Sequence, residues 1–172
     1  MSSLSKSDIE RLLKLLNDKL RSDSVTGEIY LVGGAVMCMV FDARESTRDV
    51  DAFFKPTSRI REAAAKVAKE NELDERWLND AVKGYLSSKG SYSNYMELSN
   101  LKVLTAKPEY LLAMKCLAMR IGEEFRDLDD IRYLLRTLGI ESYQEAVAVI
   151  TQYYPLKKFP EKTIYALEEL LG

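Results

Sequence analysis

The chain has 172 residues, of which 47% are hydrophobic and 30% charged, as in an ordinary globular protein that can bury a core of its own. Its 25 Lys and Arg against 27 Asp and Glu give a formal net charge of −2, which disfavours a dedicated duplex-DNA binder because such proteins carry a basic excess. The absence of histidine excludes a Ser-His-Asp or Cys-His catalytic set and a histidine-ligated zinc.

The cysteines and the hydropathy indicate the compartment. Cys38 and Cys116 are far apart and each lies among apolar neighbours, so we predict buried thiols in a reducing environment. No stretch approaches the 18 or more consecutive apolar residues of a membrane span, and residues 1–20 do not resemble a signal peptide. We therefore expect a cytoplasmic location and no membrane association.

Helix-like and strand-like segments alternate through the first half of the chain. Ser7 and Glu10 fit a capping box, and apolar residues at three- and four-residue spacing then predict an amphipathic helix to about Arg21. The following segments are predicted in chain order as strand 28–32, a short buried helix over 35–41 that starts on two glycines, polar loop 42–48, strand 49–54, helix 60–72 and a short helix within 73–85.

The second half reads mainly as helix. Residues 84–95, with two glycines and several serines, predict a loop that could run over a site. Strands are then predicted at 95–98 and 101–104, and helices at 108–121, 125–138, 142–153 and 160–171. We predict an α+β (α/β) fold, with a small mixed β-sheet flanked by helices in residues 1–106 and a helical part in residues 107–172.

Two carboxylates and a glycine pair point to one chemistry. Asp49 and Asp51 are two apart on a predicted strand, so both leave the same face and repel each other unless a cation lies between them. Gly33 and Gly34 end the preceding strand and open a helix, where backbone N–H groups can approach a phosphate closely. Alone, either feature is more often an ordinary turn or a solvated loop, so the inference depends on their order along the chain.

The order of these motifs resembles a known superfamily. The chain reads L-V-G-G-A at 31–35 and T-R-D-V-D at 47–51, similar to the strand-GG-helix and T-x-D-x-D motifs of the DNA polymerase β nucleotidyltransferases. A later stretch, P-E-Y-L-L-A-M-K at 108–115 followed by R-D-L-D-D-I at 126–131, is similar to the prokaryotic branch that contains AbiEii-like toxins. The resemblance covers roughly residues 28–136 and implies the core fold of that superfamily.

The resemblance implies a metal-dependent nucleotidyltransferase. Gly33 and Gly34 match the turn that faces the nucleotide's phosphates, and Thr47 matches the residue before the metal carboxylates. Asp49 and Asp51 match the carboxylates that hold Mg²⁺ or Mn²⁺. In the superfamily reaction an acceptor hydroxyl attacks the α-phosphate of an NTP and pyrophosphate leaves.

Further charged residues follow from the same resemblance. Lys115 matches a lysine near the triphosphate, and Asp127 matches an acidic residue needed for activity in the toxin branch. Arg120 and Arg126 supply cations that could bind the nucleotide, although Lys115 could equally be a surface lysine and Arg126 part of an exposed ion-paired helix face. The resemblance permits an RNA or protein hydroxyl as acceptor and an antitoxin-like partner.

The chain departs from the superfamily pattern in one respect. Many members carry a third carboxylate on a later strand, whereas the strand predicted at 101–104 has no acid. Glu97 is the nearest candidate for a further metal ligand, and Asp80 a poorer one. An alternative is therefore a catalytically inactive protein of this fold that binds nucleotide or a partner as a regulatory module. A third hypothesis is a structural protein with an apolar interface around residues 153–160.

Overall fold

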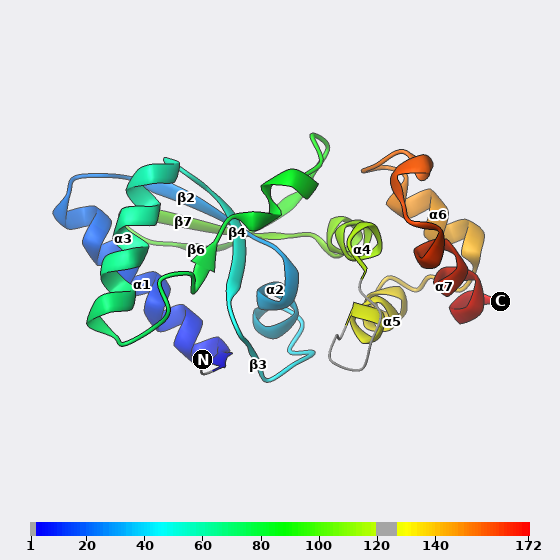
Figure 1. Ribbon diagram of the computed structural model, residues 1–172, viewed down its shortest axis with the longest axis horizontal. Coiled ribbons are helices and arrows are strands. Elements are labelled where there is room, and N and C mark those ends of the chain that lie inside the picture. Colours follow the sequence, from blue (N-terminus) through cyan, green and yellow to red (C-terminus); the bar gives the residue numbers. More distant parts are fainter. Residues whose placement is uncertain (1–2, 120–126) are drawn as a thin grey trace. The chain divides into compact units, whose positions relative to one another are not determined.

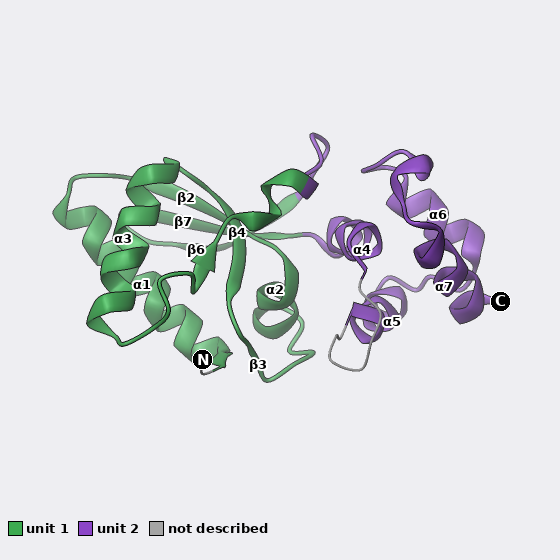
Figure 2. Ribbon diagram, viewed as in Figure 1, with its two compact units in different colours: residues 1–84, 92–106 green, residues 85–91, 107–172 purple. Residues whose placement is uncertain are grey.

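Figure 2 separates the structure, a computed structural model that describes residues 3–119 and 127–172, into two compact units. Unit 1 comprises residues 1–84 and 92–106, and unit 2 comprises residues 85–91 and 107–172. Unit 1 is built around a β-sheet, whereas unit 2 is helical in the part that the structure describes. The chain leaves unit 1 after Gly84 and returns to it at Tyr92, so that each unit contains two separate stretches of chain.

A mixed sheet forms the centre of unit 1 (Figure 1). Its five strands are β2 (Gly27–Leu31), β4 (Val50–Lys55), β5 (Leu78–Asn79), β6 (Tyr92–Glu97) and β7 (Leu101–Ala106). They lie in the order β5-β4-β2-β7-β6. Strand β2 is antiparallel to β4 and parallel to β7, β6 is antiparallel to β7, and β5 is parallel to β4. The predicted fold class, a small mixed sheet with helices, is confirmed.

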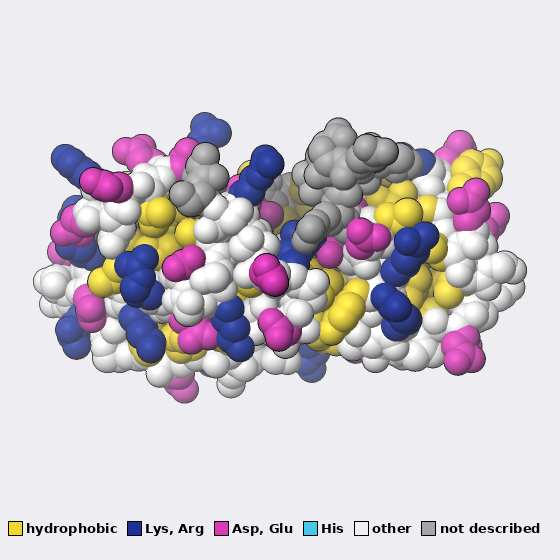
Figure 3. Space-filling model, turned by 90° about the horizontal axis from the view of Figure 1, so that it is seen from below, with side chains coloured by type: hydrophobic (Ala, Val, Ile, Leu, Met, Phe, Trp, Pro, Cys, Tyr) yellow, Lys and Arg dark blue, Asp and Glu magenta, His cyan; other side chains and the backbone are white. Residues whose placement is uncertain are grey.

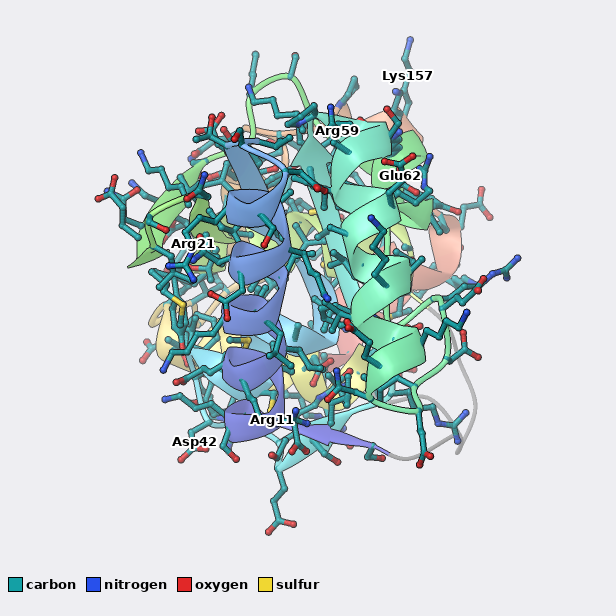
Figure 4. The ribbon with its side chains drawn as sticks, turned by 90° about the vertical axis from the view of Figure 1, so that its left-hand side faces the viewer. Arg11, Arg21, Asp42, Arg59, Glu62 and Lys157 are labelled. Atoms are coloured by element: carbon teal, nitrogen blue, oxygen red, sulfur yellow. The ribbon has the colours of Figure 1, made fainter. Side chains whose placement is uncertain are left out.

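Two long helices, α1 (Lys6–Ser22) and α3 (Thr57–Glu70), pack against each other and against the sheet, and Figure 4 shows them side by side. Each buries an apolar stripe at helical spacing, as the sequence predicts. In α1 this stripe consists of Ile9, Leu12, Leu13, Leu16 and Leu20. The sheet contributes alternate residues to the same core, such as Ile29 and Leu31 of β2.

The residues that alternate with this buried set lie on the other face of the sheet. Tyr30 of β2 contacts Phe53 of β4 and Tyr92 of β6, with ring centroids 5.7 and 4.9 Å apart. Asp51 belongs to this face as well, because its neighbours Val50 and Ala52 are both fully buried in the core. The register of β4 therefore turns Asp51 away from the apolar core.

The start of α1 differs from the sequence prediction. Ser5, not Ser7, is the N-cap, and its capping box is completed by Asp8 in place of Glu10. The Ser5 hydroxyl accepts the Asp8 N–H at 3.1 Å, and the Asp8 carboxylate accepts the Ser5 N–H at 2.9 Å. The two residues before α1 form a short strand, β1 (Leu4–Ser5), which pairs with β3 (Ser46–Thr47). This pairing holds Ser5 in the extended conformation that an N-cap requires.

The segment 73–85 also differs from the prediction, which placed a short helix within it. It contains the short strand β5 and a 3₁₀-helix, η1 (Ala81–Tyr85). The indole of Trp77 is fully buried and donates from Nε1 to the Ala64 carbonyl at 3.0 Å. Its own carbonyl accepts the Val50 N–H at 2.6 Å, which aligns β5 with the start of β4. Long-range pairing therefore decides the structure of this segment.

Unit 2 packs its helices around an apolar core and an aromatic group. Its helices are α4 (Pro108–Leu117), α5 (Asp127–Thr137), α6 (Tyr143–Ile150), η2 (Leu156–Lys158) and α7 (Glu161–Leu171). Tyr110 stacks on Tyr153 with centroids 5.0 Å apart, and its hydroxyl accepts the Ser87 N–H at 2.9 Å. The Ser87 hydroxyl in turn donates to the Tyr153 carbonyl at 2.6 Å. These bonds attach the 85–91 stretch to the helices of unit 2.

Two further sequence expectations concern the whole chain. Among the described residues, both thiols are free and buried, as predicted, and burial raises the pKa of Cys116 to about 12. Within the ranges 3–119 and 127–172, none of the helices combines the length and the apolar character that crossing a bilayer requires.

Candidate functional site

The end of β2 brings the glycine turn next to Asp51. The Val32 N–H donates to the Asp51 carbonyl at 3.0 Å, which continues the β2–β4 ladder by one residue past Leu31. Gly33 follows immediately with a φ of +65°, a left-handed conformation that L side chains rarely adopt. A Cβ at Gly33 would lie 3.1 Å from the Asp51 Oδ2 atom. The absence of a side chain at residue 33 therefore leaves room for the Asp51 carboxylate against the turn.

The side chains near Gly34 are an arginine and a threonine, whereas the side chain near Gly33 is an aspartate. A Cβ at this residue would lie 2.8 Å from Nη1 of Arg44 and 3.0 Å from Oγ1 of Thr47. Gly34 is the second residue of helix α2 (Gly33–Met39), which packs against β4 and β3. A side chain at residue 33 would thus meet a carboxylate, and one at residue 34 would meet a guanidinium and a hydroxyl.

Thr47 and Asp49 lie at the end of the segment that connects α2 to β4. Thr47 is buried in the short strand β3, and its hydroxyl donates to the Asp49 carbonyl at 3.2 Å. Asp49 lies one residue before β4 begins and, like Asp51, is half-buried. The structure therefore brings Gly33, Gly34, Thr47 and Asp51 to one end of the sheet, with Asp49 two residues before Asp51 on the same strand path.

Arg44 is a residue at this end of the sheet that the sequence did not single out. The loop from α2 to β4 contains two arginines, Arg44 and Arg48, and no local pattern distinguishes them. In the structure Arg48 is exposed, whereas Arg44 is half-buried with its guanidinium against Gly34. The sequence carries no signal for which arginine lies beside Gly34, because this depends on how the loop folds back over the start of α2.

The residue that pairs with Asp51 on strand β5 is Asn79, whose side chain is an amide. In the parallel pairing of β4 with β5, Asp51 lies opposite Asn79, so both side chains lie on the same face. The Asn79 side-chain carbonyl accepts the Ala81 N–H at 3.3 Å. Asp80 follows, but Arg61 at 2.6 Å and Lys83 at 2.8 Å bind its carboxylate. The hydrogen bond from Lys83 is the main cause that lowers the Asp80 pKa.

Glu97, the further metal ligand considered from the sequence, lies elsewhere. It pairs with Lys102 of β7, which pairs with Glu28 of β2, and Glu28 pairs with Lys55 at the far end of β4. Asp51 lies at the opposite end of β4, and β2 and β7 separate its strand from β6. The register therefore corrects that expectation, since Glu97 cannot share a cation with Asp51.

Lys115 and Asp127 belong to unit 2, where they form a buried ion-paired cluster. The Lys115 ammonium lies 3.3 Å from Asp127 Oδ1 and 2.8 Å from Asp130 Oδ2. The side chains of the three residues are 11%, 5% and 7% exposed in the order Lys115, Asp127 and Asp130. Lys115 is therefore not a surface lysine, and Asp130 is a member of the cluster that the sequence did not assign.

Some expected features fall outside what the structure describes or lack local support in it. Arg120 and Arg126 lie outside the described residues. Within those residues, no group of three or more Cys, Asp or Glu is arranged to hold a metal ion, so a cation at Asp49 and Asp51 would take its other ligands from water and phosphate. On the face drawn in Figure 3, basic and acidic side chains are interspersed, in keeping with the near-zero net charge.

Comparison with known proteins identifies the fold. The chain matches no family model, and no curated protein is similar to it in sequence. Among solved structures, it is similar to the crystal structure of an antigenic nucleotidyltransferase-like protein from Paracoccidioides brasiliensis. The TM-score is 0.50 at 16% sequence identity, over 96% of this chain and 95% of that chain. At this identity the likeness establishes the fold alone, and the chain therefore shares a nucleotidyltransferase-like fold.

Proposed function

We propose that this protein is a metal-dependent nucleotidyltransferase, which moves an NMP group from an NTP to a hydroxyl of an RNA or protein acceptor. The observation that carries the proposal is the Asp51 carboxylate, whose Oδ2 lies 3.1 Å from the position that a Cβ of Gly33 would occupy. A carboxylate that faces a side-chain-free turn is suited to hold a cation beside phosphates. The nucleotidyltransferase-like fold supports the same reaction class.

The side chains at the end of β4 fit Mg²⁺ or Mn²⁺. Asp49 and Asp51 offer only oxygen atoms, which these hard cations prefer, and both are half-buried. Two protein carboxylates suit Mg²⁺ in particular, because this ion usually keeps several waters and binds substrate phosphates. When bound, the cation would neutralise phosphate charge as the bond between the α-phosphorus and pyrophosphate breaks.

The chain's own residues position the reactants. Gly33 and Gly34 leave space in which backbone N–H groups can approach the phosphates of the nucleotide. Thr47 holds the Asp49 carbonyl through its hydroxyl and so fixes the entry of the chain into β4. The acceptor hydroxyl attacks the α-phosphorus, forms the new P–O bond and releases pyrophosphate, and its proton passes to solvent or to a neighbouring carboxylate.

The residues of unit 2 form a separate part of the proposal. Their roles near the triphosphate rest on the resemblance of residues 108–131 and not on the Asp49 and Asp51 site. The AbiEii-like branch and an antitoxin-like partner rest on that same stretch. The proposal for the glycine turn and the two aspartates stands without them.

One observation favours a second function, a nucleotide-binding regulatory module without turnover. Asn79, an amide, is the residue beside Asp51 on the neighbouring strand. An amide contributes no negative charge to a metal site and cannot serve as a base. A site with two carboxylates can therefore bind a metal-nucleotide and still lack the group that completes catalysis.

Transfer of label from each α-labelled NTP tests the proposal. The protein is incubated with Mg²⁺ or Mn²⁺, pooled RNA and itself as acceptors, alongside Asp49→Asn, Asp51→Asn and the exposed loop variant Asp42→Asn as a matched control. We expect transfer by wild type and Asp42→Asn and its loss in the two site variants. Metal-dependent binding without transfer would identify the regulatory module. Transfer that survives in Asp51→Asn would overturn the site.

A further inference from the structure

Arg44 occupies the space beside Gly34 that a side chain at residue 34 would fill. Its Nη1 and Cζ atoms lie 2.8 and 3.6 Å from the position of a Gly34 Cβ, so the plane of the guanidinium is close to the turn. Thr47 approaches the same position through Oγ1 at 3.0 Å. The close approach of Arg44 and Thr47 explains why residue 34 is a glycine, because any larger residue would displace the arginine or the threonine.

We infer that Arg44 binds the terminal phosphates of the nucleotide at this turn, an inference that rests on the proposed function. A triphosphate brings several negative charges towards Asp49 and Asp51, and a divalent cation offsets only two of them. Helix α2 has only seven residues, and its N-terminus contributes no more than a partial positive charge. A guanidinium supplies a permanent positive charge and paired donors that match phosphate oxygens.

The residues around the turn assign this task to Arg44. Residues 34 and 35 are glycine and alanine, so neither provides a hydroxyl to a phosphate. Arg48, the other arginine of the loop, is exposed, and the Thr47 hydroxyl donates to the Asp49 carbonyl. Arg44 is the cation that the structure places against Gly34, and it carries the recognition of phosphate number, whereas Asp49 and Asp51 carry the dependence on metal.

Affinity as a function of phosphate number tests this assignment. The Kd of each nucleoside tri-, di- and monophosphate is measured with Mg²⁺ for wild type, Arg44→Gln, Arg44→Lys and the exposed control Arg48→Gln. We expect Arg44→Gln to weaken NTP binding by about ten- to a hundredfold, the range of a lost charge-assisted hydrogen bond, and to leave NMP binding nearly unchanged. Arg44→Lys should recover part of the loss because it keeps the charge.

The outcomes separate this inference from the proposed function. Equal weakening of NTP and NMP in Arg44→Gln, or unchanged NTP affinity in a folded Arg44→Gln, would overturn the role of Arg44 while Asp51→Asn still abolishes the metal dependence. Failure of wild type to bind any NTP would remove both. If Arg44→Gln does not fold, Arg44→Lys supplies the test, since it keeps the charge, loses the paired donors and should lower the preference for triphosphate in part.

Discussion

The two units of this chain treat their acidic residues differently. In unit 2, Asp127 and Asp130 are nearly inaccessible and share one ammonium, that of Lys115. In unit 1, Asp49 and Asp51 are half-buried at the end of a strand, and Asp51 lies against a turn that has no side chains. In unit 2 the ammonium of a lysine side chain neutralises the carboxylates, whereas in unit 1 the carboxylates are only half-buried and keep part of their contact with solvent.

The difference in burial between the two pairs of carboxylates matters because burial raises the free-energy cost of keeping a side chain charged. Removing a carboxylate from water is expensive, and the cost is recovered only by a close partner with good geometry. A buried cluster such as Lys115 with Asp127 and Asp130 is therefore sensitive to the loss of any member. A half-buried pair retains part of its hydration, so it can be held in the folded protein and still bind a divalent cation. Stability and binding should accordingly respond to different substitutions.

The largest effect on stability is expected for Lys115→Met, which keeps the volume of the side chain and removes its charge. Asp127 and Asp130 would then be buried without their shared ammonium, and we expect a loss of about 3–5 kcal/mol in the free energy of unfolding, measured by urea denaturation. Lys157→Met, an exposed change in the same unit, should stay within about 0.5 kcal/mol of wild type. Equal stability of the two variants would show that the cluster does not depend on Lys115.

A smaller effect on stability is expected for alanine substitutions at two glycines that have the same backbone conformation, one in each unit. Gly33 has φ +65° beside Asp51, and Gly139 has φ +67° with nothing within 4 Å of a Cβ. Alanine at either residue should cost about 1–2 kcal/mol through backbone strain, measured by thermal or urea unfolding. Only Gly33→Ala should also reduce the rise in Tm that Mg²⁺ and an NTP produce, because its Cβ displaces the Asp51 carboxylate. A normal nucleotide response in Gly33→Ala would separate the turn from the site.

The smallest effect concerns the start of α1, which lies beside the strand pairing that holds Thr47. Ser5→Ala removes the N-cap and should lower the free energy of unfolding by about 1 kcal/mol, whereas Ser7→Ala should have little effect. Urea denaturation of both variants measures the difference. A larger loss in Ser7→Ala would restore the cap first predicted from the sequence.

The same cap has a pH dependence of known sign. The backbone hydrogen bond from Ser5 is the main cause that lowers the Asp8 pKa below its usual value. Asp8 therefore contributes its stability above the unfolded pKa of about 3.9 and loses it as the pH falls through the lower folded pKa. In Asp8→Asn this acid-dependent part of the stability should be absent. Unfolding curves at several pH values below 5 measure it.

Local patterns predicted which segments would be helix or strand wherever the pattern was long. The stripe of α1 and the strand before Gly33 needed only residue spacing, because a helix or strand must bury one face. The capping box was less determined, since both Ser5-x-x-Asp8 and Ser7-x-x-Glu10 fit the motif, and the pairing of β1 with β3 selected the first. The segment around Trp77 was predicted incorrectly because its backbone pairs with β4, a partner more than twenty residues away.

Residue patterns alone were enough to predict the mixed fold class and the order of its main elements. The expectation that Asp49 and Asp51 act together stays a prediction, since β4 begins only at Val50. The sequence also determined that catalysis by histidine is excluded. The folded chain was needed to show that Asn79 pairs with Asp51, that Glu97 lies at the other end of the sheet, and that Arg44 lies beside Gly34. Strand register and loop closure join residues far apart in the chain, and periodicity within one segment carries no information about them.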